Sequence, residues 1–245
     1  MKRLFAAGAI PLCCALLLSG CVAVNIYPFA AVHGKGELVR YELTAGEYTS
    51  IILSGALEVV YTQSDTPSLT LDVQENLREY FTADISGDTL TVRAERGIYW
   101  PDSKAPVLRV ATPRLRSLSL EGAGTVTADG VIAAEELMVS LSGAGTVICE
   151  VDAASLTVRM SGAGTVTLSG SARQASLKLD GAGDIDALTL QTAEADVTLD
   201  GVGSVYVSCS HKLKITAGGV GSVEYIGSPS VDITKDGLVS VKKRG

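Results

Sequence analysis

The sequence is short of the residue types on which most catalytic and metal sites depend. Only two of its 245 residues are histidine, His33 and His211, and aromatic residues make up 5%. Two isolated histidines provide neither a Ser/His/Asp arrangement nor metal-ligand spacing. The basic residues Arg159, Lys178 and Lys214 are scattered along the chain. We therefore expect no catalytic residue, no metal and no cofactor, and a carbohydrate-active enzyme with paired carboxylates is the less favoured alternative.

Basic residues are in deficit as well. The formal net charge is −7, from 20 Lys and Arg against 27 Asp and Glu. If a leader carrying Lys2 and Arg3 is removed, the balance becomes 18 − 27 = −9. An acidic surface repels phosphate groups, so the composition argues against nucleic acid as a partner and against direct adsorption to anionic lipid.

The apolar run at the N-terminus is too short for a transmembrane helix, which needs about 20 residues. It extends over 15 residues from Leu4 to Leu18, follows Lys2-Arg3 and ends at Ser19-Gly20-Cys21. This order resembles a bacterial lipoprotein signal. We predict a signal peptide over residues 1–20, acylation of Cys21 with chains such as palmitate, and a tether over residues 21–36. The alternative is a leader that is removed elsewhere, with no lipid.

Acyl chains on Cys21 would attach the protein to a membrane. The next residue, Val22, is not the Asp that resembles an inner-membrane retention signal. We therefore expect a lipid-anchored protein of the cell envelope, with the outer membrane favoured. Whether it faces the periplasm or the cell surface stays open.

The cysteines predict no disulfide. Cys13 and Cys14 lie in the leader, and Cys21 is the expected lipid site. The remaining two, Cys149 and Cys209, are three repeats apart, roughly 14 Å at the spacing of stacked strands and too far for a disulfide. We expect both to be small buried apolar residues.

Glycine is abundant and falls in a repeated phrase. A Gly-x-Gly followed by a polar and then a β-branched residue occurs six times, with first glycines at positions 122, 143, 162, 181, 201 and 219. The intervals are 21, 19, 19, 20 and 18 residues, which indicates a structural repeat. Within each interval apolar residues alternate with polar ones, as at Leu137, Val139 and Leu141, and this is the pattern of a β-strand.

Each repeat therefore predicts two short strands joined at a Gly-x-Gly corner. Both glycines occupy positions that alternate in step with the apolar residues and therefore face inward. At these positions a side chain would collide with the core or require strained backbone. One repeat cannot bury its own apolar row, but repeats stacked at about 4.8 Å bury it continuously. We predict an all-β fold, with a parallel β-helix, or solenoid, over residues 111–245.

The competing interpretation of Gly-x-Gly is a phosphate-binding loop. That loop needs a third glycine and a helix that follows a strand. Thr127, Ile148 and Thr167 stand where the third glycine would be. The sequence therefore disfavours nucleotide binding.

Residues 37–110 alternate in the same way but lack the repeat. We expect them to form a β-rich region that caps one end of the solenoid, where unpaired strand edges would otherwise invite aggregation. Ser54-Gly55-Ala56 is a degenerate copy of the repeated phrase and suggests the start of the first coil. Gln74–Tyr80 predicts a helical turn, and Ser86-Gly87-Asp88 predicts a hairpin loop. At the other end we expect Lys242-Lys243-Arg244 to protect the last edge.

Stacked repeats would align polar residues in columns beside the glycine corner. The residue after each Gly-x-Gly gives Thr125, Thr146, Thr165, Asp184, Ser204 and Ser222. The residue before it gives Glu121, Ser142, Ser161, Asp180 and Asp200. We take the first column, with Asp180 and Asp200, as a possible ligand face that binds a glycan through many hydrogen bonds. The same pattern is equally that of a solvated polar face.

Two further features lie at the same corner. Asp180, Asp184, Asp186 and Asp200 offer the oxygen ligands that Ca²⁺ prefers, although they lie outside any calcium-repeat motif. Small apolar residues between the paired glycines either permit a tight bend or form a strip that docks a partner. These residues are Ala123, Ala144, Ala163, Ala182, Val202 and Val220.

Three stretches of the chain carry a family resemblance: Ile52 to Val59, Leu141 to Gly145, and Tyr225-Ile226-Gly227-Ser228-Pro229. Together they resemble the bacterial auto-transporter adhesin, head GIN domain family, over roughly residues 37–243. The resemblance implies a right-handed β-helix, attachment as a lipoprotein and an adhesin role without catalytic residues. In most repeats of this chain Thr or Ser follows the Gly-x-Gly corner, at the position where Asp is common in the family. Only Asp184 keeps the acidic residue at that position.

We therefore predict a non-enzymatic envelope lipoprotein that binds glycan or protein partners through the outer face of a β-helix. The alternative from another class is a structural spacer of the envelope with no ligand.

Overall fold

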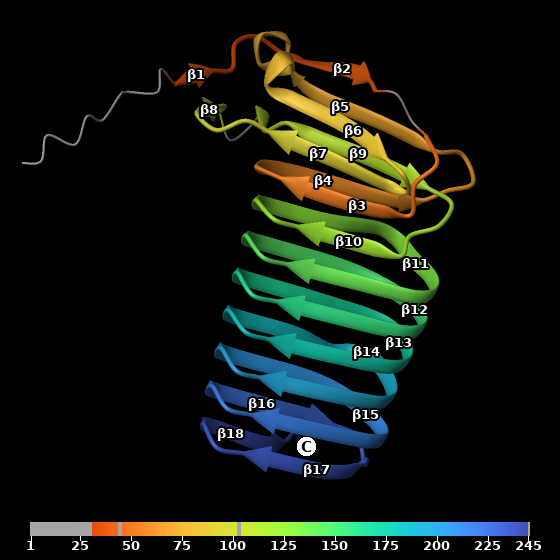
Figure 1. The fold of residues 1–245 in the computed structure, drawn as a ribbon, viewed down its shortest axis with the longest axis vertical. Helices are drawn as coiled ribbons and strands as arrows, with labels where there is room; N and C mark the ends of the chain where they lie inside the picture. The colour runs from red at the N-terminus through yellow and green to blue at the C-terminus, as the bar shows by residue number, and fades with distance from the viewer. Residues whose placement is uncertain (1–30, 44–45, 102–103, 245) are drawn as a thin grey trace, which may run out of the picture. The chain divides into compact units, whose positions relative to one another are not determined.

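Each coil of the solenoid is a run of extended backbone that bends twice (Figure 1). One bend, the glycine corner, lies at Gly-x-Gly between consecutive long strands. The other, the second corner, lies within the long strands, a few residues after Gly130 in the first of them and Gly170 in the third, where the alternation of buried and exposed residues breaks. Figure 1 shows this bend at the opposite edge of the stack. The long strands are β11 (Ala123–Leu141), β12 (Ala144–Met160), β13 (Ala163–Leu179), β14 (Ala182–Leu199) and β15 (Val202–Ala217).

The structure is a computed structural model that describes residues 31–43, 46–101 and 104–244. The predicted signal peptide, Cys21 and the tether up to residue 30 lie outside the described residues. Among the helices of the described part, none has the length and apolar character needed to cross a membrane.

The coils pair in parallel and in register. Leu141, Met160 and Leu179 are successive register partners, and at most 1% of each residue is exposed. Burying each such side chain contributes about 1.5–3 kcal/mol to stability. About seven turns stack in a right-handed sense around this apolar row (Figure 1). The predicted right-handed parallel β-helix is confirmed.

The second corner absorbs the variation in repeat length. β11 has 19 residues against 17 in β12, and the register between them shifts between Thr127 and Val131. A second shift, between Thr167 and Ser169, accommodates the extra residue of β14. The glycine corner keeps one geometry because the variable residues lie at the other edge.

The parallel stack begins before the first full glycine phrase. β3 (Ser50–Ser54) and β4 (Ala56–Gln63) pair in parallel with β10 (Ser117–Leu120) and β11. Gly55 stands between β3 and β4 at φ 97°, as the corner of this coil. The first coil therefore lies within the segment 37–110, at the position that Ser54-Gly55-Ala56 suggested.

Antiparallel strands cover the N-terminal end of the stack (Figure 1). The strands of this region are β2 (Leu38–Glu42), β5 (Ser68–Gln74), β6 (Phe81–Ser86), β7 (Thr89–Ala94) and β9 (Val107–Thr112). β5 pairs antiparallel with β2 and β9, and β6 with β7, whereas β7 and β9 continue the parallel stack on β3 and β4. The predicted helical turn is the 3₁₀ helix η1 (Glu75–Tyr80), and the predicted hairpin loop joins β6 to β7. β1 (Val32–His33) pairs with β8 (Ile98–Tyr99), so the end of the predicted tether is hydrogen-bonded to the fold.

The stack ends with three short strands, β16 (Val220–Ile226), β17 (Ser230–Lys235) and β18 (Leu238–Lys243). β17 pairs with β15, and β18 pairs with β16. Arg244 follows β18, and its Nη1 lies 3.8 Å from Glu224 Oε2 on β16.

The neighbouring coil, more than the core, requires glycine at the corner. A Cβ atom on Gly143 would overlap the carbonyl oxygen of Gly122, and one on Gly162 would overlap that of Gly143. The second glycine of the phrase has positive φ in most coils, for example 144° at Gly164. The expected backbone strain is confirmed. The main obstacle to a side chain is the backbone of the preceding coil, and the core contributes at Gly183, where a Cβ atom would lie 2.7 Å from Met160 Cε.

Candidate functional site

The residues that follow the glycine corner form the predicted column. Thr125, Thr146 and Thr165 are successive register partners, and Asp184, Ser204 and Ser222 continue the same row. All six are partly exposed, while the valine or isoleucine after each is buried. The column therefore runs along the outer face of the strand segments that follow the glycine corner, with one residue in every coil.

Two further residues, absent from the predicted column, extend it at its ends. Glu58 pairs with Thr125 at one end, and Ser240 pairs with Ser222 at the other. Neither follows a complete Gly-x-Gly, because Leu57 and Val239 replace the second glycine. The signal that identifies them is the spacing of three residues from the single corner glycines, Gly55 and Gly237.

Hydrogen bonding divides the column into two parts. Ser204 N donates to Asp184 Oδ1 at 3.0 Å, and Ser222 Oγ donates to Ser204 Oγ at 3.2 Å. Among the described residues, by contrast, the threonine hydroxyls of this column have no hydrogen-bond partner. Three outward hydroxyls at the coil spacing of about 4.8 Å are available to water or to a ligand.

The residues before the corner are exposed and partly paired within the protein. Lys178 Nζ lies 3.1 Å from Asp180 Oδ2. A Cβ atom on Gly218 would lie 3.1 Å from Asp200 Oδ1 and 3.2 Å from Asp236 Oδ1, so these two carboxylates flank the glycine. The other members, Glu121, Ser142 and Ser161, are exposed.

The aspartates proposed for Ca²⁺ do not form a coordination shell. Asp184 accepts from Ser204 N, and Asp186 Oδ1 accepts from Leu188 N at 3.1 Å. Among residues 31–43, 46–101 and 104–244, no group of three or more carboxylate, thiol or imidazole side chains is placed to hold a metal ion.

The small apolar residues of the corner form a continuous outward ridge. They remain in register from β4 to β18. Their side chains become larger toward the C-terminal end, where Val202 is 58% exposed and Leu238 is 80% exposed. Alanine permits the tight bend, and the larger side chains leave an apolar strip in solvent. The members are Ala56, Ala123, Ala144, Ala163, Ala182, Val202, Val220 and Leu238.

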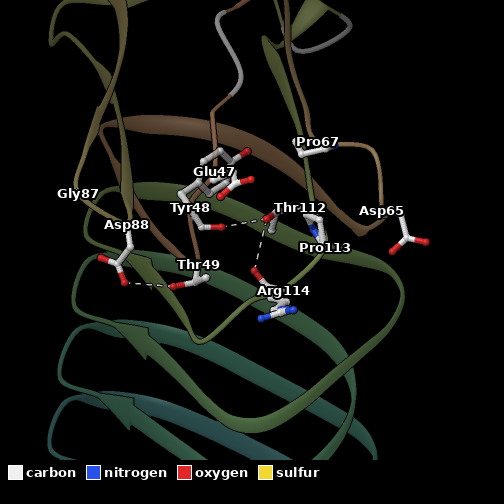
Figure 2. Close-up of a pocket in the computed structure, with 10 residues that line it drawn as sticks. All are labelled: Glu47, Tyr48, Thr49, Asp65, Pro67, Gly87, Asp88, Thr112, Pro113 and Arg114. Atoms are coloured by element: carbon white, nitrogen blue, oxygen red, sulfur yellow. Dashed lines mark hydrogen bonds between the residues drawn. The ribbon is translucent and has the colours of Figure 1, made fainter.

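A pocket of about 590 Å³ lies where the cap meets the first coil (Figure 2). Thr112 Oγ1 donates to the Tyr48 carbonyl oxygen at 2.9 Å, and Thr49 Oγ1 donates to Asp88 Oδ2 at 3.1 Å. Asp65 and Arg114 add exposed charges to its wall. No sequence pattern predicts this pocket, because its residues come from four separate segments of the chain and share no motif.

Burial and pairing change the acidity of several groups outside the column. Burial raises the pKa of the Cys149 thiol to about 12 and that of the Tyr48 hydroxyl to about 12, and it raises the pKa of Tyr61 further. Cys149 and Cys209 are both free and buried, as predicted. A raised pKa makes Cys149 a poor nucleophile, since the thiolate is the reactive form.

At the capped end, Asp72 lies between two arginines. Arg40 donates to both of its carboxylate oxygens at 2.7 and 2.8 Å, and Arg109 Nε lies 3.5 Å away. The hydrogen bonds from Arg40, with the nearby charge of Arg109, lower the pKa of Asp72. This cluster orders the junction of β2, β5 and β9.

A family model described as "Putative auto-transporter adhesin, head GIN domain" matches residues 47–229. The chain belongs to the head GIN domain family. No curated protein matches it.

Crystal structures of other proteins have the same fold as this GIN-domain chain. One from Bacteroides fragilis, titled a "putative adhesin", superposes with a TM-score of 0.81 at 22% identity and covers 87% of this chain and 100% of that one. A "putative adhesin" from Parabacteroides merdae gives a TM-score of 0.67 at 22% identity, with 87% and 99% covered. A "putative lipid binding protein" from Parabacteroides distasonis gives a TM-score of 0.65 at 19% identity, with 87% of this chain and 99% of that one covered. At these identities the likeness establishes the fold alone.

The GIN-domain family and its structural neighbours are named as adhesins or binding proteins rather than enzymes. The basic residues weighed for catalysis are only partly brought together. Arg159 and Lys178 are register neighbours on the half of the coil that precedes the glycine corner, but Lys178 is paired with Asp180. Lys214 lies in a different column, 3.6 Å from Asp196 Oδ2.

Proposed function

We propose that this protein is an adhesin-like binding protein of the cell envelope that holds a glycan or protein partner on the outer face of its solenoid. The observation that carries the proposal is the register of the polar column from Thr125 to Ser222. A stack of equal coils repeats one hydrogen-bonding pattern about every 4.8 Å, which suits a polymer that offers hydroxyl groups repeatedly. Many weak contacts in a row then supply the affinity.

Attachment to the envelope completes the proposal. The order of residues from Lys2 to Cys21 resembles a lipoprotein signal, and we propose lipid attachment at Cys21 with the outer membrane as the site. Growth of cells with labelled palmitate tests this directly. The label is expected on the parent protein and absent from the Cys21→Ser variant; label that persists on the variant contradicts lipidation at this residue.

The binding face is tested by removing hydroxyls without changing shape. The double variant Thr146→Val, Thr165→Val keeps the branched side chains and deletes two unpartnered hydroxyls. On an array of envelope and host glycans, we expect it to lose about tenfold or more in affinity relative to the parent, because each hydrogen bond contributes about 0.5–1.5 kcal/mol. Thr157→Val is the matched control, since Thr157 is a partly exposed strand residue in the other half of the same coil.

The alternatives correspond to distinct outcomes. A folded parent protein that binds nothing on the array favours the spacer. Release of reducing ends from a polysaccharide panel favours the enzyme. Protease treatment of intact cells that never reaches the protein contradicts a surface adhesin.

A further inference from the structure

A trough runs along the second corner, at the edge opposite the glycine corner. It consists of two adjoining hollows of about 780 and 280 Å³, which share Ser155 and Gln174 in their walls. Successive coils contribute Glu136, Ser155, Gln174, Glu194 and Lys212 in register. From Arg116 to Lys212 the trough crosses five coil steps, or roughly 24 Å at the spacing of parallel strands.

One end of this trough opens toward the pocket of Figure 2, because Arg114 lines both. The residues that line the two hollows include small side chains, among them Ala133, Ala154 and Ala175. An extended chain could therefore lie close to the protein backbone over several coils.

The walls of the trough carry both signs of charge in alternating coils. The cationic residues are Arg114, Arg116, Arg173, Lys212 and Lys214. The anionic residues are Glu135, Glu136, Glu194 and Asp196. Along the stack the order is positive, negative, neutral at Ser155, positive, negative and positive.

Most of these charges are not neutralised by one another. Lys214 pairs with Asp196 at 3.6 Å, and Gln174 Nε2 donates to Glu194 Oε2 at 3.3 Å. Arg114, Arg116 and Arg173 make no ion pair with any other residue that the structure describes. The same holds for Glu135 and Glu136 within the described ranges. Both signs are therefore available to a ligand.

This pattern selects the class of ligand. A polyanion would be repelled by the glutamates, and a polycation would be repelled by the arginines. A neutral glycan would leave both sets of charges without partners. A chain that carries ammonium and carboxylate groups together satisfies both, through charge-assisted hydrogen bonds to the carboxylates and the guanidinium groups.

We infer that the trough binds the peptide-substituted glycan of the cell wall, peptidoglycan, through its zwitterionic stem peptides. These stems carry free ammonium and carboxylate groups on one extended chain. The inference rests on the envelope location proposed above but not on the threonine column, which lies on a different face.

Co-sedimentation of the full-length protein in mild detergent with purified peptidoglycan sacculi tests this inference. The parent is expected to bind, and to bind less in 1 M salt, because salt screens exposed charges. Neutralising the cations with Arg116→Gln, Arg173→Gln, or the anions with Glu135→Gln, Glu136→Gln, is expected to weaken binding about tenfold each. Matched controls that remove equal charge elsewhere, Arg93→Gln, Arg159→Gln and Glu79→Gln, Glu95→Gln, are expected to bind as the parent does, because these side chains are exposed and lie in neither the trough nor the polar column.

Chemically altered sacculi identify the groups that are recognised. Acetylation of the stem amines should weaken binding of the parent but should not further weaken binding of the Glu135→Gln, Glu136→Gln variant. Amidation of the stem carboxylates should weaken binding of the parent but should not further weaken binding of the Arg116→Gln, Arg173→Gln variant. Equal binding to peptide-free glycan strands, or unchanged binding by both trough variants, overturns the inference. Trough variants that no longer bind sacculi but still bind the glycan array as the parent does would assign sacculus binding to the trough alone. A Thr146→Val, Thr165→Val variant that no longer binds the array but still binds sacculi would show that the two faces act separately.

Discussion

Gly143 packs so closely on Gly122 of the preceding coil that a Cβ atom at position 143 would overlap the Gly122 carbonyl oxygen. That oxygen also accepts the hydrogen bond from Ala144 N at 2.9 Å. The backbone cannot give way without breaking the ladder between the coils. We therefore expect Gly143→Ala to lower the free energy of unfolding by about 3 kcal/mol or more. Urea unfolding measures the change.

The neighbouring Ser142→Ala is the matched control for this substitution, because Ser142 is exposed at the same bend. We expect it to change the free energy of unfolding by less than about 0.5 kcal/mol. A Gly143→Ala variant as stable as this control would show that the corner tolerates side chains.

Stability should fall in strong alkali. Burial raises the pKa of Cys149 and of Tyr48 to about 12, and raises the pKa of Tyr61 as well, so these groups ionise more readily in the unfolded chain. Their contribution is intact below about pH 9 and is lost as the pH rises toward 12, each by at most about 1.4 kcal/mol per pH unit. Urea unfolding at pH 8, 9.5 and 11 measures the slope.

Tyr61→Phe should make this slope shallower, because the variant has one fewer group to ionise on unfolding. Tyr99→Phe is the control, since Tyr99 is 55% exposed. Equal slopes for the two variants would mean that burial of Tyr61 does not oppose its ionisation.

The ion-paired Asp72 predicts the opposite behaviour in acid. Its pKa is lowered by hydrogen bonds from Arg40, so its contribution is present above about pH 4 and is lost as the pH falls through the folded-state pKa. Asp72→Asn should lower the melting temperature at pH 7 by about 2–4 °C. The further fall in melting temperature between pH 4 and pH 2 should be smaller in this variant than in the parent. Scanning calorimetry measures both; Asp84→Asn, with a 72% exposed side chain, should change neither.

The glycine phrase made the coils predictable because its interval is one turn of the solenoid. Parity alone then placed Leu141, Met160 and Leu179 in one buried row. The first coil was harder to delimit, because Leu57 stands where the second glycine would be. Its pairing with β11 depends on contacts far apart in sequence, which no local pattern reports.

The polar column was predictable for the same reason, whereas the trough was not. Column residues keep a constant distance from a glycine. Glu136, Gln174 and Lys212 follow the second corner, where coil length varies and the register shifts. Their alignment depends on where each bulge falls, and this is decided by packing rather than by a sequence motif.

Calcium provides the last test of the aspartates at the glycine corner. Ca²⁺ requires six to eight oxygen ligands at about 2.3–2.6 Å, supplied together from one place. Asp180 is instead bound to Lys178, and Asp184 and Asp186 accept from backbone N–H groups of Ser204 and Leu188. The free energy lost by breaking those contacts exceeds the free energy that Ca²⁺ binding to an exposed, incomplete coordination shell would supply. Calorimetric titration of the protein with Ca²⁺ should therefore give no heat of binding, and chelator should leave the melting temperature unchanged. A saturable heat near one ion per chain that disappears in Asp184→Asn would contradict this, because it would require the aspartates to abandon their internal hydrogen bonds.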